Sequence, residues 1–293
     1  MTQNKMGMAM RGDGIVRFGL LEKGRAAASG NFRDYGIALI VFASIAFCLH
    51  LDADSTLAFQ DLLGVCAWVF LFALLRGESR LVQAQVLVAV AFATVGEHFA
   101  SPYMEGYIYR FHNVPAYVPP GHGMVYLTAV ALARSELFKR NLKAITAMVL
   151  TAGGLWTIWG LTGAAQKDAV GALLFVVFVL FVLFGRSPGV YLGAFFVTTW
   201  LELIGVSYGN WRWVPIDPVL ELPQGNPPSG VAAWYCLVDA VALGTAPAVV
   251  KGFIWMQAAL WRRYLYPEVV PRLLFAPHLQ QDYIPALAPV VLS

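Results

Sequence analysis

The chain has 293 residues and a formal net charge of +3; 59% of its residues are hydrophobic and 13% are charged. Its mean hydropathy is +0.64, whereas a water-soluble domain of this length is less apolar and more highly charged. The composition therefore predicts an integral membrane protein. It argues against nucleic-acid binding, because the basic residues lie in short loops and near the termini rather than in a stripe on a polar face.

The first segment, residues 1–34, is polar and basic. It contains Lys5, Arg11, Arg17, Lys23, Arg25 and Arg33. It lacks the short apolar core and the small-residue cleavage site of a signal peptide. We expect a cytoplasmic tail that is disordered or lies on the membrane surface.

Apolar segments of spanning length, each roughly twenty residues, follow in order. They cover residues 35–51, 58–75, 81–100, 122–138, 143–164, 168–185, 189–208 and 231–250. The expected fold class is all-α, a polytopic membrane helix bundle of about eight transmembrane helices. We expect a first four-helix half in 35–138, a second in 139–250, and an interfacial helix with a proline-rich tail in 251–293.

The loops between these segments differ in charge. Basic residues follow the second, fourth, sixth and eighth segments: Arg76, Arg80, Arg134, Lys139, Arg140, Lys143, Arg186, Lys251, Arg262 and Arg263. The alternate loops are poor in Lys and Arg. The positive-inside rule then places both termini in the cytoplasm, which predicts a multi-pass protein of the cell inner (cytoplasmic) membrane.

Two stretches, 94–133 and 199–239, share one pattern. Each begins on an apolar helix with Thr-x-x-Glu and has a Tyr six residues after the Glu. Each then enters an aromatic loop with a Pro-Pro pair near its end, at 119–120 and at 227–228, and continues into another apolar helix. We interpret this as a duplication. Two four-helix halves would insert in the same orientation, as parallel repeats about an axis along the membrane normal.

Ionisable side chains within the apolar segments are the candidate catalytic residues, because burying such groups in lipid is costly. They are Glu97, Glu202, Asp239 and His122. The expected positions place them in the non-cytoplasmic half of the bilayer. In the structural alternative, the two Glu carboxylates are bonded to Tyr or Trp side chains, or to loop arginines.

Four aromatic residues are candidates for substrate binding: Tyr103, Tyr208, Trp211 and Trp234. They would line the entrance for a flat, apolar substrate, and the ring faces of Tyr208 and Trp211 would stabilise a cationic centre. The alternative is that they belong to the aromatic belt at the membrane interface.

Carboxylates beside aromatic rings suit acid catalysis on a carbon–carbon double bond. A carboxylic acid kept protonated by apolar surroundings donates a proton, and a second carboxylate activates water, so that no cofactor is required. The alternative is a divalent metal such as Zn, Fe or Mn, held by His98, His122, Glu97, Glu202 and Asp239. No His-Glu-x-x-His spacing supports that alternative.

The run Glu202-Leu203-Ile204-Gly205 is followed by Gly209-Asn210-Trp211-Arg212-Trp213, a proline-containing loop and Trp234 at the start of the next helix. This stretch resembles the membrane carotenoid-biosynthesis family that includes the carotenoid hydratases of the bacterioruberin and gamma-carotene type. The resemblance implies a multi-pass protein that adds water to a terminal isoprenoid double bond.

Three classes of function remain open. The first is an intramembrane enzyme acting on a membrane lipid or isoprenoid substrate. The second is a non-catalytic subunit that binds pigment, quinone or lipid beside membrane protein partners or in a homo-oligomer. The third is a small transporter. A cavity open sideways to lipid would favour the enzyme, and a water-filled path through the bundle would favour the transporter.

Overall fold

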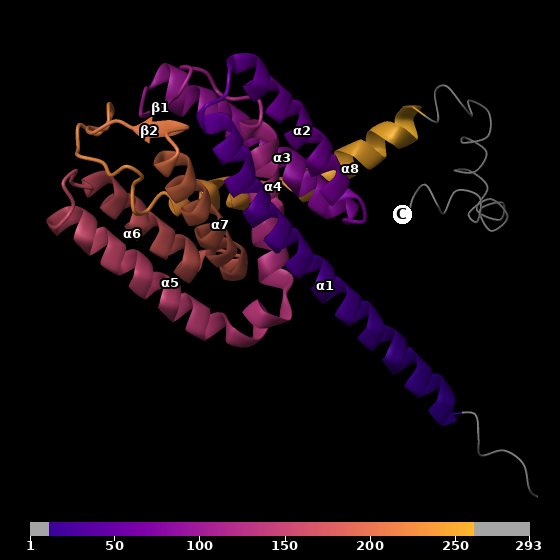
Figure 1. The fold of residues 1–293 in the computed structure, drawn as a ribbon. Coiled ribbons are helices and arrows are strands. Elements are labelled where there is room, and N and C mark those ends of the chain that lie inside the picture. Colours follow the sequence, from indigo (N-terminus) through magenta and orange to yellow (C-terminus); the bar gives the residue numbers. More distant parts are fainter. Residues whose placement is uncertain (1–11, 261–293) are drawn as a thin grey trace, which may run out of the picture.

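The computed structural model describes residues 12–260, with side chains from residue 32 onward. The described part contains eight α-helices, one π-helical turn and a two-stranded sheet (Figure 1). The helices are α1 (Gly12–Ala53), α2 (Leu57–Leu75), α3 (Arg80–His98), α4 (Val118–Arg134), α5 (Glu136–Thr162), α6 (Ala169–Phe184), α7 (Pro188–Ser207) and α8 (Ala232–Leu260). The turn is η1 (Phe99–Tyr103), and the strands are β1 (Tyr107–Tyr109) and β2 (Trp211–Trp213).

The all-α class is confirmed. Within residues 12–260, six helices are long and apolar enough to cross a membrane, namely α1 from Phe32 onward, α2, α3 extended through η1, α5, α7 and α8. The helices α4 and α6 have 17 and 16 residues and do not meet that length. Large apolar side chains are exposed on the outer helices, for example Phe184 and Phe47, as expected of surfaces that face lipid. The number of spans stays a prediction.

Two helices are longer than expected. The helix α1 begins at Gly12, within the segment expected to be a disordered or surface-lying tail, and α8 runs without a break to Leu260, into the segment expected to lie in the membrane interface. Neither extension contains a residue that must end a helix, and α8 even passes through Pro247. The expected proline-rich tail beyond residue 260 lies outside the described residues.

The helix α4 is central. It packs against α1, α2, α3 and α7. It approaches α7 closely, because a side chain at Gly193 would meet the backbone of Ala129, at 2.7 Å from its carbonyl oxygen. In the expected repeat, α3 of the first half corresponds to α7 of the second, and α4 corresponds to α8. In the structure α3 packs on α8 and α7 packs on α4. The repeat itself remains a prediction.

The two loops of the expected repeat meet in the sheet. Strands β1 and β2 are antiparallel, with Tyr107 opposite Trp213, Ile108 opposite Arg212 and Tyr109 opposite Trp211. Side chains alternate between the two faces of a strand. The four aromatic residues at the outer positions therefore point to one face, and that face lies toward the helices.

The end of the bundle that carries the sheet is held by buried polar contacts. The carboxylate of Asp52, at the end of α1, accepts hydrogen bonds from Gln60, Asn210 and Tyr117 at 2.9 Å each. Arg110 donates to the backbone carbonyl of the same aspartate. One buried carboxylate thus joins α1, α2 and both loops.

Candidate active site

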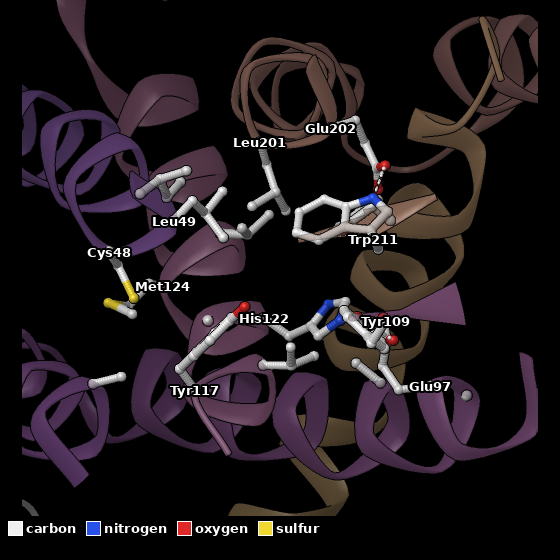
Figure 2. Close-up of a pocket in the computed structure, with 18 of the residues that line it drawn as sticks. Cys48, Leu49, Glu97, Tyr109, Tyr117, His122, Met124, Leu201, Glu202 and Trp211 are labelled. Carbon is white, nitrogen blue, oxygen red and sulfur yellow. Dashed lines mark hydrogen bonds and ion pairs between the residues drawn. The ribbon is translucent and has the colours of Figure 1, made fainter. Parts of the chain in front are cut away.

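A cavity of about 650 Å³ lies among α1, α2, α3, α4, α7, α8 and the sheet. Most of its lining is apolar, and Glu97, His122 and Glu202 bring polar groups to one end. In Figure 2, Glu202 and Trp211 lie on one wall, Glu97, His122 and Tyr109 lie on the facing wall, and Cys48 and Met124 mark the other end. Its volume is in the range of small-molecule sites.

The Glu97 carboxylate, in the last turn of α3, accepts three side-chain hydrogen bonds. The hydroxyls of Tyr107 and Tyr109 donate to Oε2 at 2.6 and 2.8 Å. His122 Nε2 lies 2.8 Å from Oε1. Hydrogen bonds to a carboxylate favour its charged form, so these donors hold Glu97 as an anion.

The Glu202 carboxylate lies in α7 and has a different set of neighbours. The indole N–H groups of Trp211 and Trp213 both donate to Oε2, at 3.0 and 3.1 Å. The residue is 5% exposed, and no arginine, lysine or histidine side chain of the described residues forms a salt bridge with it. Glu202 is therefore a desolvated carboxyl with two neutral indole donors on Oε2 and the neutral hydroxyl of Tyr235 also interacting with it.

The motif around Glu202 has a packing reason. Gly205 is one turn further along α7, and the ring of Trp211 occupies the space that a side chain at Gly205 would fill. The backbone of Gly209 has a φ of 72°, a conformation that glycine adopts at no steric cost. These two glycines let the chain leave α7 and return along β2, with Trp211 against the acid.

The sheet positions hydrogen-bond donors for both acids. Tyr107 contacts the ring of Trp213 with centroids 4.6 Å apart, and Tyr109 contacts Trp211 at 5.9 Å. Strand β1 supplies the two tyrosine donors of Glu97, and strand β2 supplies the two indole donors of Glu202. Burial and the charge of Glu97 raise the pKa of both tyrosines well above 10.0. They therefore stay protonated as donors.

His122 lies in the first turns of α4, and its ring stacks on Tyr235 with centroids 5.2 Å apart. Its side chain is 10% exposed. While Nε2 faces Glu97, Nδ1 is buried and has no hydrogen-bond partner within the described part of the chain. This nitrogen is thus an unpaired polar atom on a residue that lines the cavity.

Three of the four predicted catalytic residues thus line one cavity, but Asp239 does not. It is 2% exposed and lies one turn beyond Tyr235 on α8. Its Oδ2 has no hydrogen-bond partner among the residues described, and its ionisable neighbours are Tyr126, Tyr191 and Cys236. Helix geometry places Asp239 deeper in the bundle than the other acids.

The predicted substrate-binding residues divide into two pairs. Trp211 and Trp234 line the cavity, whereas Tyr103 and Tyr208 do not. Tyr103 is 77% exposed and stacks on Phe99, and the ring of Tyr208 packs at a tilt against that of His50. A residue six positions after a glutamate points to a different side of a helix. Only after the chain turns back do aromatic side chains reach the acids.

The expected metal alternative has no assembled ligand set. His98 is exposed, with Nδ1 2.8 Å from the Thr94 carbonyl oxygen, and Asp239 lies away from the cavity. Across the residues that the structure describes, no three His, Cys, Asp or Glu side chains gather as metal ligands.

Three donors and a stacking partner are not predicted as site residues from the sequence: Tyr107, Tyr109, Trp213 and Tyr235. The available signal was the alternation of aromatic and non-aromatic residues, with Ile108 between two tyrosines and Arg212 between two tryptophans. In a β-strand this alternation puts the aromatic residues on one face. For Tyr235 the sequence offered only a weaker indication of a site role, namely its position one helical turn before Asp239.

Comparison of the chain with protein-family models, with curated proteins and with solved structures returns no match. Fold and site define the class as a helical, multi-pass membrane protein with two acids at one end of an apolar cavity. The geometry and chemistry of the site are therefore the basis for the proposed function.

Proposed function

We propose that the protein is an intramembrane hydratase that adds water to a terminal double bond of an acyclic isoprenoid lipid. The observation that carries this proposal is the unequal pair of acids at one end of an apolar cavity. Glu97 has three donors including an imidazole, whereas the partners of Glu202 are two neutral indoles and the neutral hydroxyl of Tyr235. Unequal surroundings are what separate an acid from a base.

Glu202 is the proposed general acid. Both indole donors bind Oε2, so Oε1 is the oxygen proposed to carry the proton, and burial favours the neutral carboxyl. Transfer of this proton to the less substituted CH carbon of a trisubstituted terminal double bond forms a C–H bond and leaves a tertiary carbocation at the neighbouring carbon. The ring faces of Trp211 and Trp234 then stabilise the positive charge.

His122 is the proposed general base. Its Nδ1 accepts a proton from water as the water oxygen bonds to the cationic carbon. Glu97 holds the other ring nitrogen and stabilises the resulting imidazolium. Return of this proton to Glu202 restores both groups, so the net reaction is the addition of one water. The proposed chemistry uses no metal or organic cofactor.

The proposed location is the inner (cytoplasmic) membrane, with both termini cytoplasmic. Most basic loop residues follow α2, α4 and α6, at the end of the bundle opposite the sheet, and the positive-inside rule assigns that end to the cytoplasm. The site then belongs to the outer half of the bilayer.

A second candidate is a non-catalytic subunit that binds pigment or another lipid. The hydrogen bonds of the two acids favour this candidate. Both carboxylates are bonded to Tyr or Trp side chains, as expected if the acids have a structural role, and Glu97 is also bonded to His122. The two candidates differ in whether a bound lipid is changed.

The test is conversion of lycopene, an acyclic polyene, by the purified protein in phosphatidylcholine vesicles prepared in heavy-oxygen water. We expect a tertiary alcohol that carries the label, detected by mass spectrometry. Glu202→Gln removes the acid and should lower the rate by at least about 100-fold. Glu105→Gln, in an exposed loop position, is the control and should keep the rate. Lycopene that binds to the wild-type protein but is not converted would favour the subunit instead.

A further inference from the structure

Two glycines beside the acids have no structural reason to be glycine. Gly96 and Gly121 lie in α3 and α4, both line the cavity, and each directly precedes a site residue. A Cβ added at either one meets nothing within 4 Å. At Gly123, by contrast, a Cβ would lie 2.8 Å from Val90 and 2.9 Å from Leu71. Packing therefore requires Gly123 but neither of the other two.

Backbone geometry does not require these glycines either. Neither is among the residues with positive φ, and glycine in a helix is less favourable than alanine. The absent side chains leave open space next to Glu97 and His122. Gly96 is also exposed on the bundle surface, so part of this space reaches the outside of the protein.

The space lies where two consecutive helices separate. The helices α2 and α3 are joined by a short turn and both pack on α4, but their backbones come close to each other at few points. Cavity-lining side chains on both helices are exposed, including Leu62 on α2 at 52% and Phe92 on α3 at 39%. Both helices are long and apolar enough to span the membrane. The gap between them therefore opens toward lipid.

The cavity is elongated away from the acids. Its lining on α2 extends from Phe59 to Phe70, which is about 16 Å along the helix axis at the α-helical rise. The far part is lined by Cys48, Cys66 and Phe70 and contains no charged side chain. A cavity with acids at one end and a long apolar arm fits a linear chain whose end reaches Glu202.

We propose that the gap between α2 and α3, bordered by Gly96 and Gly121, is the entrance through which an acyclic polyene chain enters sideways from the bilayer. This inference rests on the proposed hydratase function for the nature of the chain. The chain end lies between Glu97 and Glu202, and the remainder lies along the apolar arm. The absence of side chains at these two glycines sets the width of the entrance, and therefore which lipid chains can enter the cavity.

The test fills the gap with side chains and measures binding separately from conversion. Gly96→Leu and Gly121→Leu are placed in phosphatidylcholine nanodiscs with lycopene, and retained pigment is measured by visible absorption after free lycopene is removed. We expect at least about tenfold less retained lycopene in both variants. Gly36→Leu and Gly244→Leu are matched controls, because these exposed helical glycines also have open space but do not line the cavity.

The variants Gly96→Ala and Gly121→Ala address folding. Each should unfold at a higher temperature than the wild-type protein, since alanine favours the helix, yet their combination should retain less lycopene. Equal retention in the wild-type protein, the Leu variants and the Ala combination would overturn the entrance.

The outcomes separate the two proposals. If the Leu variants retain the pigment and Glu202→Gln alone stops conversion, the hydratase stands and the entrance is wrong. If the Leu variants lose the pigment while the wild-type protein converts none, the entrance stands and the hydratase is wrong. A wild-type protein that retains no lycopene contradicts both.

Discussion

At the scale of single residues, the two glutamates differ in their donors rather than in their distance from water. Glu97 and Glu202 both line the cavity and both are largely buried. Two tyrosine hydroxyls and an imidazole surround Glu97, whereas two indoles and the hydroxyl of Tyr235 surround Glu202. Neighbouring groups, not position along the helix, therefore assign each acid its role.

The first prediction concerns a donor of Glu97. Tyr109→Phe removes the hydroxyl that donates to the carboxylate at 2.8 Å, and we expect a loss of about 1.5–3 kcal/mol in the free energy of unfolding, as for hydrogen bonds to charged groups. Denaturant unfolding in detergent micelles measures it. Tyr103→Phe is the control, since this side chain is 77% exposed, and it should change stability little. Equal effects of the two substitutions would mean that the Glu97 contact contributes nothing.

At the scale of elements, the loop between β2 and α8 is held by one buried aspartate. The Oδ1 atom of Asp168 accepts from the backbone N–H groups of Gly171 and Gly225 at 2.9 and 2.7 Å, and Oδ2 accepts from Ser229 at 2.7 Å. The same carboxylate thus caps α6 and fixes the loop that leads from Trp213 into α8. The cavity wall at Trp234 depends on this contact.

The second prediction is that Asp168→Ala loosens this loop. Three buried N–H groups lose their acceptor, and each costs about 1–3 kcal/mol when left unsatisfied. Limited proteolysis should cut within 214–230 faster, and the unfolding temperature should fall. Asp217→Ala also removes a carboxylate that accepts from two backbone N–H groups, but in an exposed turn. A loss as large for Asp217→Ala as for Asp168→Ala would show that burial at Asp168 is unimportant.

At the scale of the whole molecule, an ion cluster closes the end of the bundle opposite the sheet. Glu78, in the turn between α2 and α3, accepts from Arg33 and Arg134 at 2.7 Å each, and Arg134 also binds Asp34. Arg33 donates to backbone carbonyls at the end of α2, including Leu74. The cluster joins α1, α2, α3 and α4 where α2 and α3 are covalently connected. The two helices can then separate only toward the sheet.

The third prediction is a dependence of stability on pH. Burial by itself would raise the pKa of Glu78, but the hydrogen bonds and charge of Arg134, with Arg33, hold it below its ordinary value of 4.5. A folded-state pKa below the unfolded one stabilises the protein above pH 4.5, and this contribution is lost as the pH falls through the folded value. Glu78→Gln should cost about 3 kcal/mol near neutral pH and flatten the acid part of the profile. Thermal unfolding from pH 3 to 7 measures both; parallel profiles would contradict the assignment to Glu78.

Much of the architecture could be predicted from the sequence because it depends on local properties. Apolar segments of spanning length predict helices in a membrane whatever their order of packing. The matching positions of Glu97 and Glu202 likewise predicted acids on equivalent helices, and both line the cavity. Tyr103 and Tyr208 were chosen by the same spacing but point elsewhere, because equal spacing does not set the direction in which a side chain points.

The sequence alone determined the class, an apolar helical chain with few buried ionisable groups, because hydrophobicity and helix length act locally along the chain. Tertiary structure decided which of those groups form the site. The pairing of β1 with β2 brings donors to both acids, while Asp239 is left one turn deeper in the bundle. The reason is that a hydrogen bond between residues distant in sequence requires a particular packing of helices, and periodicity within one helix carries no information about that packing.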